Sequence, residues 1–268
     1  MKTTASPSQD MYGCVALRGA QALQMLHGQC TQAVKGLSDA HAPLAGFCST
    51  KGRLIAAGRI WATTDGACIL TCTDVIERLI HHLTPFARLA RVELQPDPRP
   101  VSLKCSEVSA PAGQLTRDHD QLTITEHGQT HWVLGAETGL ETTALRDQIE
   151  AGFTFVHDAV SDRFLPQQLH YPLLQGVSFQ KGCYTGQEVV ARLEHLGRVK
   201  RYAQRYDSPV TLEIGQEVNI ADWTGEVVQT VQLAEESRAL VVIDATAHSE
   251  QLRGVPFPVE PVIPRQRP

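Results

Sequence analysis

The chain has 268 residues, of which 42% are hydrophobic, 20% charged and 6% aromatic. These proportions are typical of a globular protein and exclude the disordered, collagen-like and coiled-coil classes. The formal net charge of −5 gives the molecule as a whole no attraction to nucleic acid, so a direct nucleic-acid contact would need a local basic patch. No apolar run approaches the roughly 18 residues of a membrane-spanning helix, so no membrane association is expected.

The N-terminal residues 1–13 are polar and contain no arginine, which fits neither a secretory signal nor a transit peptide. We expect the first ten of them to form a frayed tail. The seven cysteines are odd in number and widely spaced, unlike a disulfide framework. We therefore expect a protein of the reducing cytoplasm.

Short strands and one short helix are predicted for the first quarter of the chain. Tyr12–Arg18 has the pattern of a strand, and apolar spacing predicts a helix within Gly19–Gln29. Residues 43–73 are predicted to form three short strands with turns at Lys51-Gly52 and Asp65-Gly66. The Asp-Gly pair is a strong hairpin signal.

A longer helix is predicted over Asp74–Leu89, with Asp74 as N-cap and Pro85 as a kink or break. Residues 91–135 alternate strand patterns with turn clusters, residues 141–151 are predicted to be helical, and residues 161–177 irregular.

After Gly197 the chain alternates short β-rich runs with turns, a pattern typical of a small β-barrel or sandwich. The proline-rich residues 255–268 are expected to lie extended on the surface. We therefore predict an α+β protein with one region over residues 1–197, which has room for two subdomains, and a C-terminal β-barrel domain over residues 198–268.

Familiar nucleotide and metal motifs are absent from the sequence. Residues 46–53 and 176–183 both read Gly-x4-Lys, but they lack the glycine before the lysine and the Ser/Thr after it that a phosphate loop needs. Cys68 and Cys72 share one face of a predicted strand, yet no CxxC or Cys/His set accompanies them. We expect both thiols to be buried packing residues, and no metal site is predicted.

The segment FQKGCYTGQEVVAR, residues 179–192, places a cysteine before a predicted helix. Thr185 and Glu188 fit a capping box, with Thr185 at the N-cap, and Gly197 ends the helix. Cys183 would then lie near the positive end of the helix dipole, with the charge of Lys181 nearby, and both favour the thiolate. The local pattern leaves open a buried, inert cysteine. Likewise, Glu188 could serve only as a cap or as the partner of Arg192.

Taken together, KGCYTGQE (181–188), Ala191-Arg192 and Gly197 closely resemble the signature of the YgfZ family, within the superfamily of the glycine-cleavage T-protein, an aminomethyltransferase. LRGAQALQMLHGQCT (17–31), Lys51-Gly52-Arg53 and the lead-in from Phe164 also resemble elements of that family.

The resemblance implies a T-protein-like fold, with antiparallel sheets and helices around a central cavity that binds tetrahydrofolate or another folate. It implies that Cys183 is the functional thiol and that Lys51 and Arg53 line the cavity. The motif companions of the thiol are Lys181, Gly182, Tyr184, Gly186, Gln187, Glu188 and Arg192. The implied role is support of iron–sulfur cluster assembly or repair, and through it of tRNA modification, with iron–sulfur client or assembly proteins as partners.

The sequence departs from the family pattern at several positions. Gln32 and Ala33 stand where the family has Asn-Asp, and His170 stands where it has asparagine. T-protein relatives carry an aspartate after the second glycine element, whereas residues 54–60 contain no carboxylate. Because aminomethyl transfer needs an acid/base group, we favour a folate-dependent accessory protein that is not an enzyme.

Two other functions are considered. The alternative is a tetrahydrofolate-dependent aminomethyl or one-carbon transferase. An RNA-contacting module on the terminal β domain is a weaker hypothesis, because the sequence has no aromatic-rich basic strand. The basic residues around 198–205 would either contact a partner or form an ordinary solvated junction.

Overall fold

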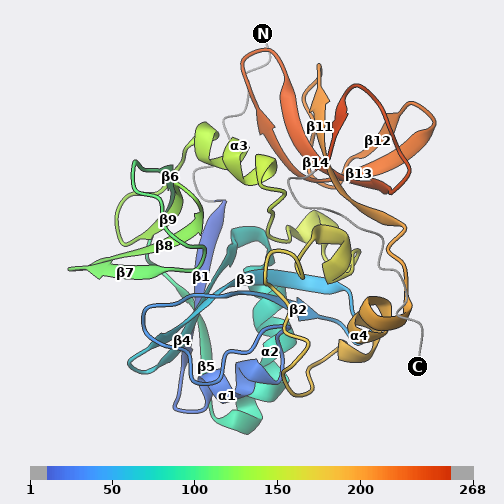
Figure 1. Ribbon diagram of the computed structural model, residues 1–268. Coiled ribbons are helices and arrows are strands. Elements are labelled where there is room, and N and C mark those ends of the chain that lie inside the picture. Colours follow the sequence, from blue (N-terminus) through green and yellow to red (C-terminus); the bar gives the residue numbers. More distant parts are fainter. Residues whose placement is uncertain (1–10, 255–268) are drawn as a thin grey trace.

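The computed structural model describes residues 11–254, which form three five-stranded sheets with four α-helices and three short 3-10 helices (Figure 1). The predicted N-terminal tail and the predicted extended C-terminal tail lie outside these residues. The mixture of antiparallel sheets and few helices confirms the α+β class.

The first sheet has the strand order β2-β3-β4-β1-β5, and all its pairings are antiparallel. Its strands and helices are β1 (Tyr12–Arg18), α1 (Ala22–His27), β2 (Leu44–Cys48), β3 (Leu54–Thr63), β4 (Gly66–Cys72), the 3-10 helix η1 (Thr73–Val75), α2 (Ile76–Ala90) and β5 (Glu93–Asp97). The three predicted strands and the hairpin at Gly66, where φ is +154°, are confirmed. Cys68 and Cys72 are both buried in β4, as predicted.

Helix α2 covers one face of this sheet through Ile76, Leu79, Leu83 and Ala87, which follow helical spacing. The predicted N-cap was wrong. Asp74 lies in η1, and its carboxylate accepts hydrogen bonds from the backbone N–H of Asp158 and from His157 instead of capping the helix. Pro85 does not end the helix, which continues to Ala90.

The second sheet has the order β10-β6-β9-β8-β7, and β10 runs parallel to β6 while the other pairings are antiparallel. Its strands are β6 (Val101–Cys105), β7 (Leu115–Asp118), β8 (Gln121–His127), β9 (Thr130–Leu134) and β10 (Gly139–Leu140), and α3 (Thr142–Glu150) follows. An irregular segment then carries η2 (Asp158–Val160) and η3 (Pro166–Leu169) and leads to α4 (Gln187–Leu196).

The third sheet has the order β12-β13-β14-β11-β15. Its strands are β11 (Arg201–Ser208), β12 (Glu217–Ile220), β13 (Trp223–Gln232), β14 (Ser237–Asp244) and β15 (Leu252–Arg253). The expected small barrel is thus a five-stranded sheet, and its edge strands β12 and β15 do not pair with each other within residues 11–254.

Strand β14 shows how the third sheet joins the rest of the molecule. Leu240 and Val242 pack into the large core shared with the first two sheets, whereas Val241 and Ile243 pack into a smaller core of the third sheet itself. This alternation follows from the period of two in a strand. Glu150, at the end of α3, adds ion pairs to Arg205 and Arg238 of the third sheet. Among the basic residues around 198–205, Arg205 therefore forms an ion pair within the protein, between the third sheet and α3.

No helix within residues 11–254 is both long and apolar enough to cross a membrane.

Candidate functional site

The loop that carries Cys183 is fixed to the segment after α1. Lys181 Nζ donates to the backbone carbonyl oxygens of His27 and, at 2.6 Å, of Cys30. The same ammonium lies 4.8 Å from the ring centroid of the buried Tyr184, within range of a cation–π interaction. Burial lowers the pKa of Lys181 and raises the pKa of Tyr184. Lys181 therefore anchors the loop to the segment after α1, and Tyr184 packs against the Lys181 ammonium.

The predicted capping box was wrong. Helix α4 begins at Gln187, and its N-cap is Gly186, with φ +82° and no side-chain cap. Thr185 Oγ1 instead donates to Gln29 Oε1 at 2.9 Å, because the segment after α1 offers a closer partner than the helix does. The exposed Glu188 pairs with Arg192 at 3.6 Å across one helical turn. The predicted end of the helix before Gly197 is confirmed.

Two glycine turns pack against each other beside this loop. A Cβ on Gly186 would overlap the carbonyl oxygen of Ser49 and lie 2.9 Å from Gly52 Cα. A Cβ on Gly52, where φ is +74°, would lie 2.9 Å from Val189 Cβ of α4. Backbone can approach this closely only without side chains, so each turn requires its glycine. Three motifs far apart in sequence, residues 28–31, 51–53 and 181–188, therefore meet at one place.

Cys183 is the only exposed cysteine of the seven, all of which lie within the described residues; five are buried and Cys105 is half-buried. The neighbouring Gly182 has open space where a Cβ would be. The exposure of Cys183 excludes a buried packing cysteine at this position.

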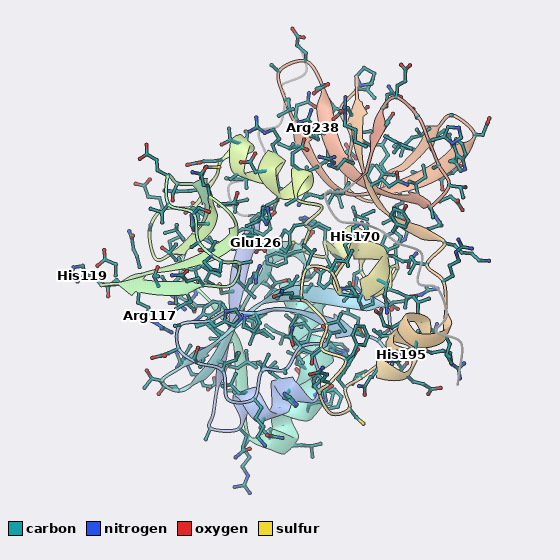
Figure 2. The ribbon with its side chains drawn as sticks, viewed as in Figure 1. Arg117, His119, Glu126, His170, His195 and Arg238 are labelled. Carbon is teal, nitrogen blue, oxygen red and sulfur yellow. The ribbon has the colours of Figure 1, made fainter. Side chains whose placement is uncertain are left out.

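A cavity lies elsewhere, between the first and second sheets. It has two adjoining chambers, of about 140 and about 210 Å³, which share Arg59, Ala112 and Leu174 in their walls. The smaller chamber adds Glu126 and Phe153, and the larger one adds polar groups from Gln32, His41 and Gln175. Figure 2 labels Glu126 near the middle of the molecule and His195 on α4 near its edge.

The wall of both chambers contains a buried ion pair. Arg59 of β3 donates two hydrogen bonds to the carboxylate of Glu126 of β8, from Nε to Oε2 at 3.0 Å and from Nη2 to Oε1. Trp132 Nε1 donates to the same Oε2 at 2.7 Å, and Arg59 Nη1 donates to the carbonyl oxygen of Ala42. Both side chains are almost wholly buried, so the pair is a fixed, planar hydrogen-bonding wall.

Two segments that hydrogen-bond to each other, residues 30–32 and 175–181, run from the cavity to the loop that carries Cys183. Gln32 Nε2 donates to the carbonyl oxygen of Gln175 at the cavity, and Thr31 Oγ1 donates to the carbonyl oxygen of Gly176 next to it. Farther along, Ser178 N donates to Thr31 O, and Lys181 reaches Cys30. These hydrogen bonds connect the cavity wall with the loop that carries Cys183.

The site residues predicted from the sequence lie around the Cys183 loop and are not among the residues that line the cavity. Lys51 and Arg53 are exposed on either side of Gly52, and neither is among the residues that line the two chambers. Their contact with folate stays a prediction. Sequence reasoning missed Arg59 and Glu126. The signal for Arg59 was a single charge inside the apolar run LIAAGRIWA, which implies a buried partner.

Comparison with known proteins decides the family. The chain is 30% identical over 225 residues to the tRNA-modifying protein YgfZ of Yersinia pseudotuberculosis serotype IB (strain PB1/+), covering 72% of this chain and 68% of that protein. The chain belongs to the YgfZ family. The YgfZ protein of Serratia proteamaculans (strain 568) is likewise 30% identical, over 226 residues and with the same coverage. No protein-family model matches the chain.

The structure of this YgfZ family member is similar to the glycine cleavage system aminomethyltransferase T from Bartonella henselae. The TM-score is 0.61, the identity is 11%, and the match covers 88% of this chain and 76% of that one. The predicted T-protein-like fold is thereby confirmed.

Proposed function

We propose that this protein binds a reduced folate in the two-chambered cavity and acts as an accessory protein of tRNA modification, not as an aminomethyltransferase. Membership of the YgfZ family and the T-protein-like fold support this role. The observation that carries it is the hydrogen-bonded connection between the cavity and an anchored, exposed cysteine.

The cavity residues fit a folate. A pteridine ring is flat, with two apolar faces and an edge of hydrogen-bonding groups, and ligand pockets commonly combine apolar walls with a few fixed polar groups. Phe153 and Leu174 supply apolar surface, and the Arg59–Glu126 pair supplies the fixed polar wall. The larger chamber, with Gln32 and His41, suits the more polar remainder of the molecule. Partial burial and the charge of Arg59 lower the pKa of His41, which favours its neutral form.

For Cys183 we propose the finer role of a functional thiol in iron–sulfur cluster assembly or repair. Its exposure suits chemistry with a second protein, since a thiolate acts only where a partner can reach it. This role rests on the family resemblance together with the loop geometry.

An aminomethyl or one-carbon transferase is the alternative, and one observation favours it. The cavity does contain a carboxylate, Glu126, contributed by β8 where residues 54–60 have none. However, that carboxylate already accepts hydrogen bonds from Arg59 and Trp132, which hold it in its acceptor role and leave it poorly suited to taking a proton.

Folate binding is tested by thermal unfolding with tetrahydrofolate. A ligand that binds only the folded state stabilises it by about 2.7 kcal/mol at 100 times its Kd, so the melting temperature should rise. Ala112→Trp places an indole in the wall of both chambers and should abolish the shift. Ala234→Trp, at an exposed alanine of the third sheet, is the matched control and should keep it. No shift in the natural protein would refute folate binding.

The remaining proposals are tested separately. Methylene-tetrahydrofolate formation from aminomethyl donors, measured under conditions in which tetrahydrofolate binds, decides the transferase alternative: binding without turnover rules it out. Cys183→Ala should keep the folate shift but fail to rescue an iron–sulfur-deficient strain, whereas Cys105→Ala should rescue it. Full rescue by Cys183→Ala would remove the role given to this thiol.

A further inference from the structure

A second cluster of chemically active side chains lies away from both the cavity and the cysteine loop. Cys72 ends β4, Asp74 lies in η1, and His157 precedes η2, and one ligand atom from each lies within 4.8 Å of the others. Cys72 and His157 are buried, whereas the Asp74 side chain is 48% exposed. No local sequence pattern indicates this cluster, because His157 is 85 residues from Cys72.

The hydrogen bonds fix the tautomer of the histidine. Asp74 Oδ2 lies 3.3 Å from His157 Nδ1, and a carboxylate accepts, so the ring proton is on Nδ1. The lone pair of Nε2 therefore points inward, where Cys72 Sγ lies at 3.6 Å and Gln229 Nε2 at 3.4 Å. Metal-binding histidines in proteins likewise donate one ring N–H to a carboxylate and use the lone pair of the other nitrogen as the ligand. Here that lone pair faces the Cys72 thiol and the Gln229 amide.

The distances also match a metal ion without any large rearrangement. Zinc binds thiolate at about 2.3 Å and imidazole at about 2.0–2.1 Å in tetrahedral geometry, which places the two ligand atoms about 3.6 Å apart. That is the observed separation of Cys72 Sγ and His157 Nε2. The Asp74 side chain, at the edge of the cluster, is half-exposed.

We propose that Cys72, His157 and Asp74 form a binding site for a thiophilic divalent metal ion of the zinc class. Cys72 Sγ and His157 Nε2 are ligands, and Asp74 holds the histidine in place through Nδ1. On binding, the Cys72 thiol releases its proton to solvent and the thiolate takes its place on the metal.

The position of the site gives the metal a structural consequence. Cys72 pairs with Tyr12 of β1, and Gln229, which faces His157, lies at the bulge of β13 in the third sheet. Gln229 Nε2 also lies 3.4 Å from the hydroxyl of Tyr12. A metal here would tie the first sheet to the segment that carries His157, directly against the third sheet. Without a metal, the cluster connects these elements through hydrogen bonds.

The experiment is a titration of chelator-treated, full-length protein with Co²⁺, whose complexes with thiolate absorb in the near ultraviolet by charge transfer. We expect a one-to-one band that disappears in Cys72→Ser and persists in two controls. Cys183→Ser removes the exposed thiol, and Cys68→Ser removes another buried thiol of the same strand. Zn²⁺ should displace Co²⁺ and raise the melting temperature of the natural protein.

If Cys72→Ser fails to fold, Asp74→Asn still tests the proposal, because a substitution at the half-exposed Asp74 is expected to leave the fold intact. It should weaken Co²⁺ binding at least tenfold while leaving the protein folded. The proposal is overturned if no thiolate band forms, if the band survives in Cys72→Ser, if it disappears in Cys183→Ser, or if Asp74→Asn binds Co²⁺ as tightly as the natural protein.

Discussion

Replacing Gly186 with alanine tests how the cysteine loop is held. The residue has φ +82°, and a left-handed conformation costs a non-glycine residue about 1–2 kcal/mol. Its new Cβ would also overlap the carbonyl oxygen of Ser49, and forced overpacking costs about 1–3 kcal/mol more. We therefore expect a loss of about 2–5 kcal/mol in the free energy of unfolding, measured by urea denaturation.

Gly182→Ala is the matched control within the same motif. A Cβ there meets nothing within 4 Å, and Gly182 is not among the residues with positive φ. The alanine should therefore leave stability unchanged or raise it by up to about 1 kcal/mol, because it restricts the unfolded chain. Equal effects of the two substitutions would refute the close packing of the two glycine turns.

Three further predictions concern other parts of the molecule. Arg59→Met should cost about 3–5 kcal/mol, because it leaves the buried Glu126 carboxylate without its cation; adding Glu126→Gln should recover part of that loss in urea unfolding, and strictly additive effects would contradict the pairing. Lys181→Met should speed amide hydrogen exchange at Ser178 and Gln187, the hydrogen-bonded amides on either side of the loop, at least about tenfold, since a charge-assisted hydrogen bond contributes about 1.5–3 kcal/mol; unchanged exchange would show that Lys181 does not anchor the loop. Burial raises the pKa of Asp207, but Arg238 and Arg253 outweigh it and hold that pKa below its usual range. This stabilisation exists above the unfolded-state pKa of about 3.9 and is lost as the pH falls through the folded value, so the natural protein should exceed Asp207→Asn by about 1 kcal/mol at pH 7 and by nothing at low pH. A gap that does not change with pH would count against this assignment.

Local sequence patterns predicted the elements whose stability is local. The strand Tyr12–Arg18, the hairpin at Gly66 and the end of α4 before Gly197 follow from alternation, turn chemistry and glycine. The same reasoning failed where a distant partner competed. Asp74 and Thr185 are both good N-cap residues, yet their side chains form hydrogen bonds with His157 and Gln29 instead. Capping contributes only about 1 kcal/mol, so a tertiary hydrogen bond can replace it.

The cavity could not be predicted from the sequence, because its defining pair is made across the chain. Arg59 and Glu126 are 67 residues apart and come from strands of different sheets. Arg59 alone stands out as a single charge in an apolar run, but nothing in the sequence identifies Glu126 as its partner, and only the approach of the two sheets makes them a buried pair. The motif around Cys183 was visible because its residues are consecutive, but the direction in which each side chain points was not.

Those directions separate two kinds of residue within the motif. Lys181, Tyr184 and Thr185 face inward and hold the loop, while Cys183 and the Glu188–Arg192 pair are exposed. A thiol that acted on a small bound molecule would be expected inside a pocket, where water is excluded. A thiol exposed on a rigidly anchored loop instead suits contact with another macromolecule, with little conformational entropy left to lose on binding. The anchoring therefore favours a protein partner for Cys183, and the cavity proposed to bind folate, at the other end of the same hydrogen-bonded segments, would then act on that partner only through the loop.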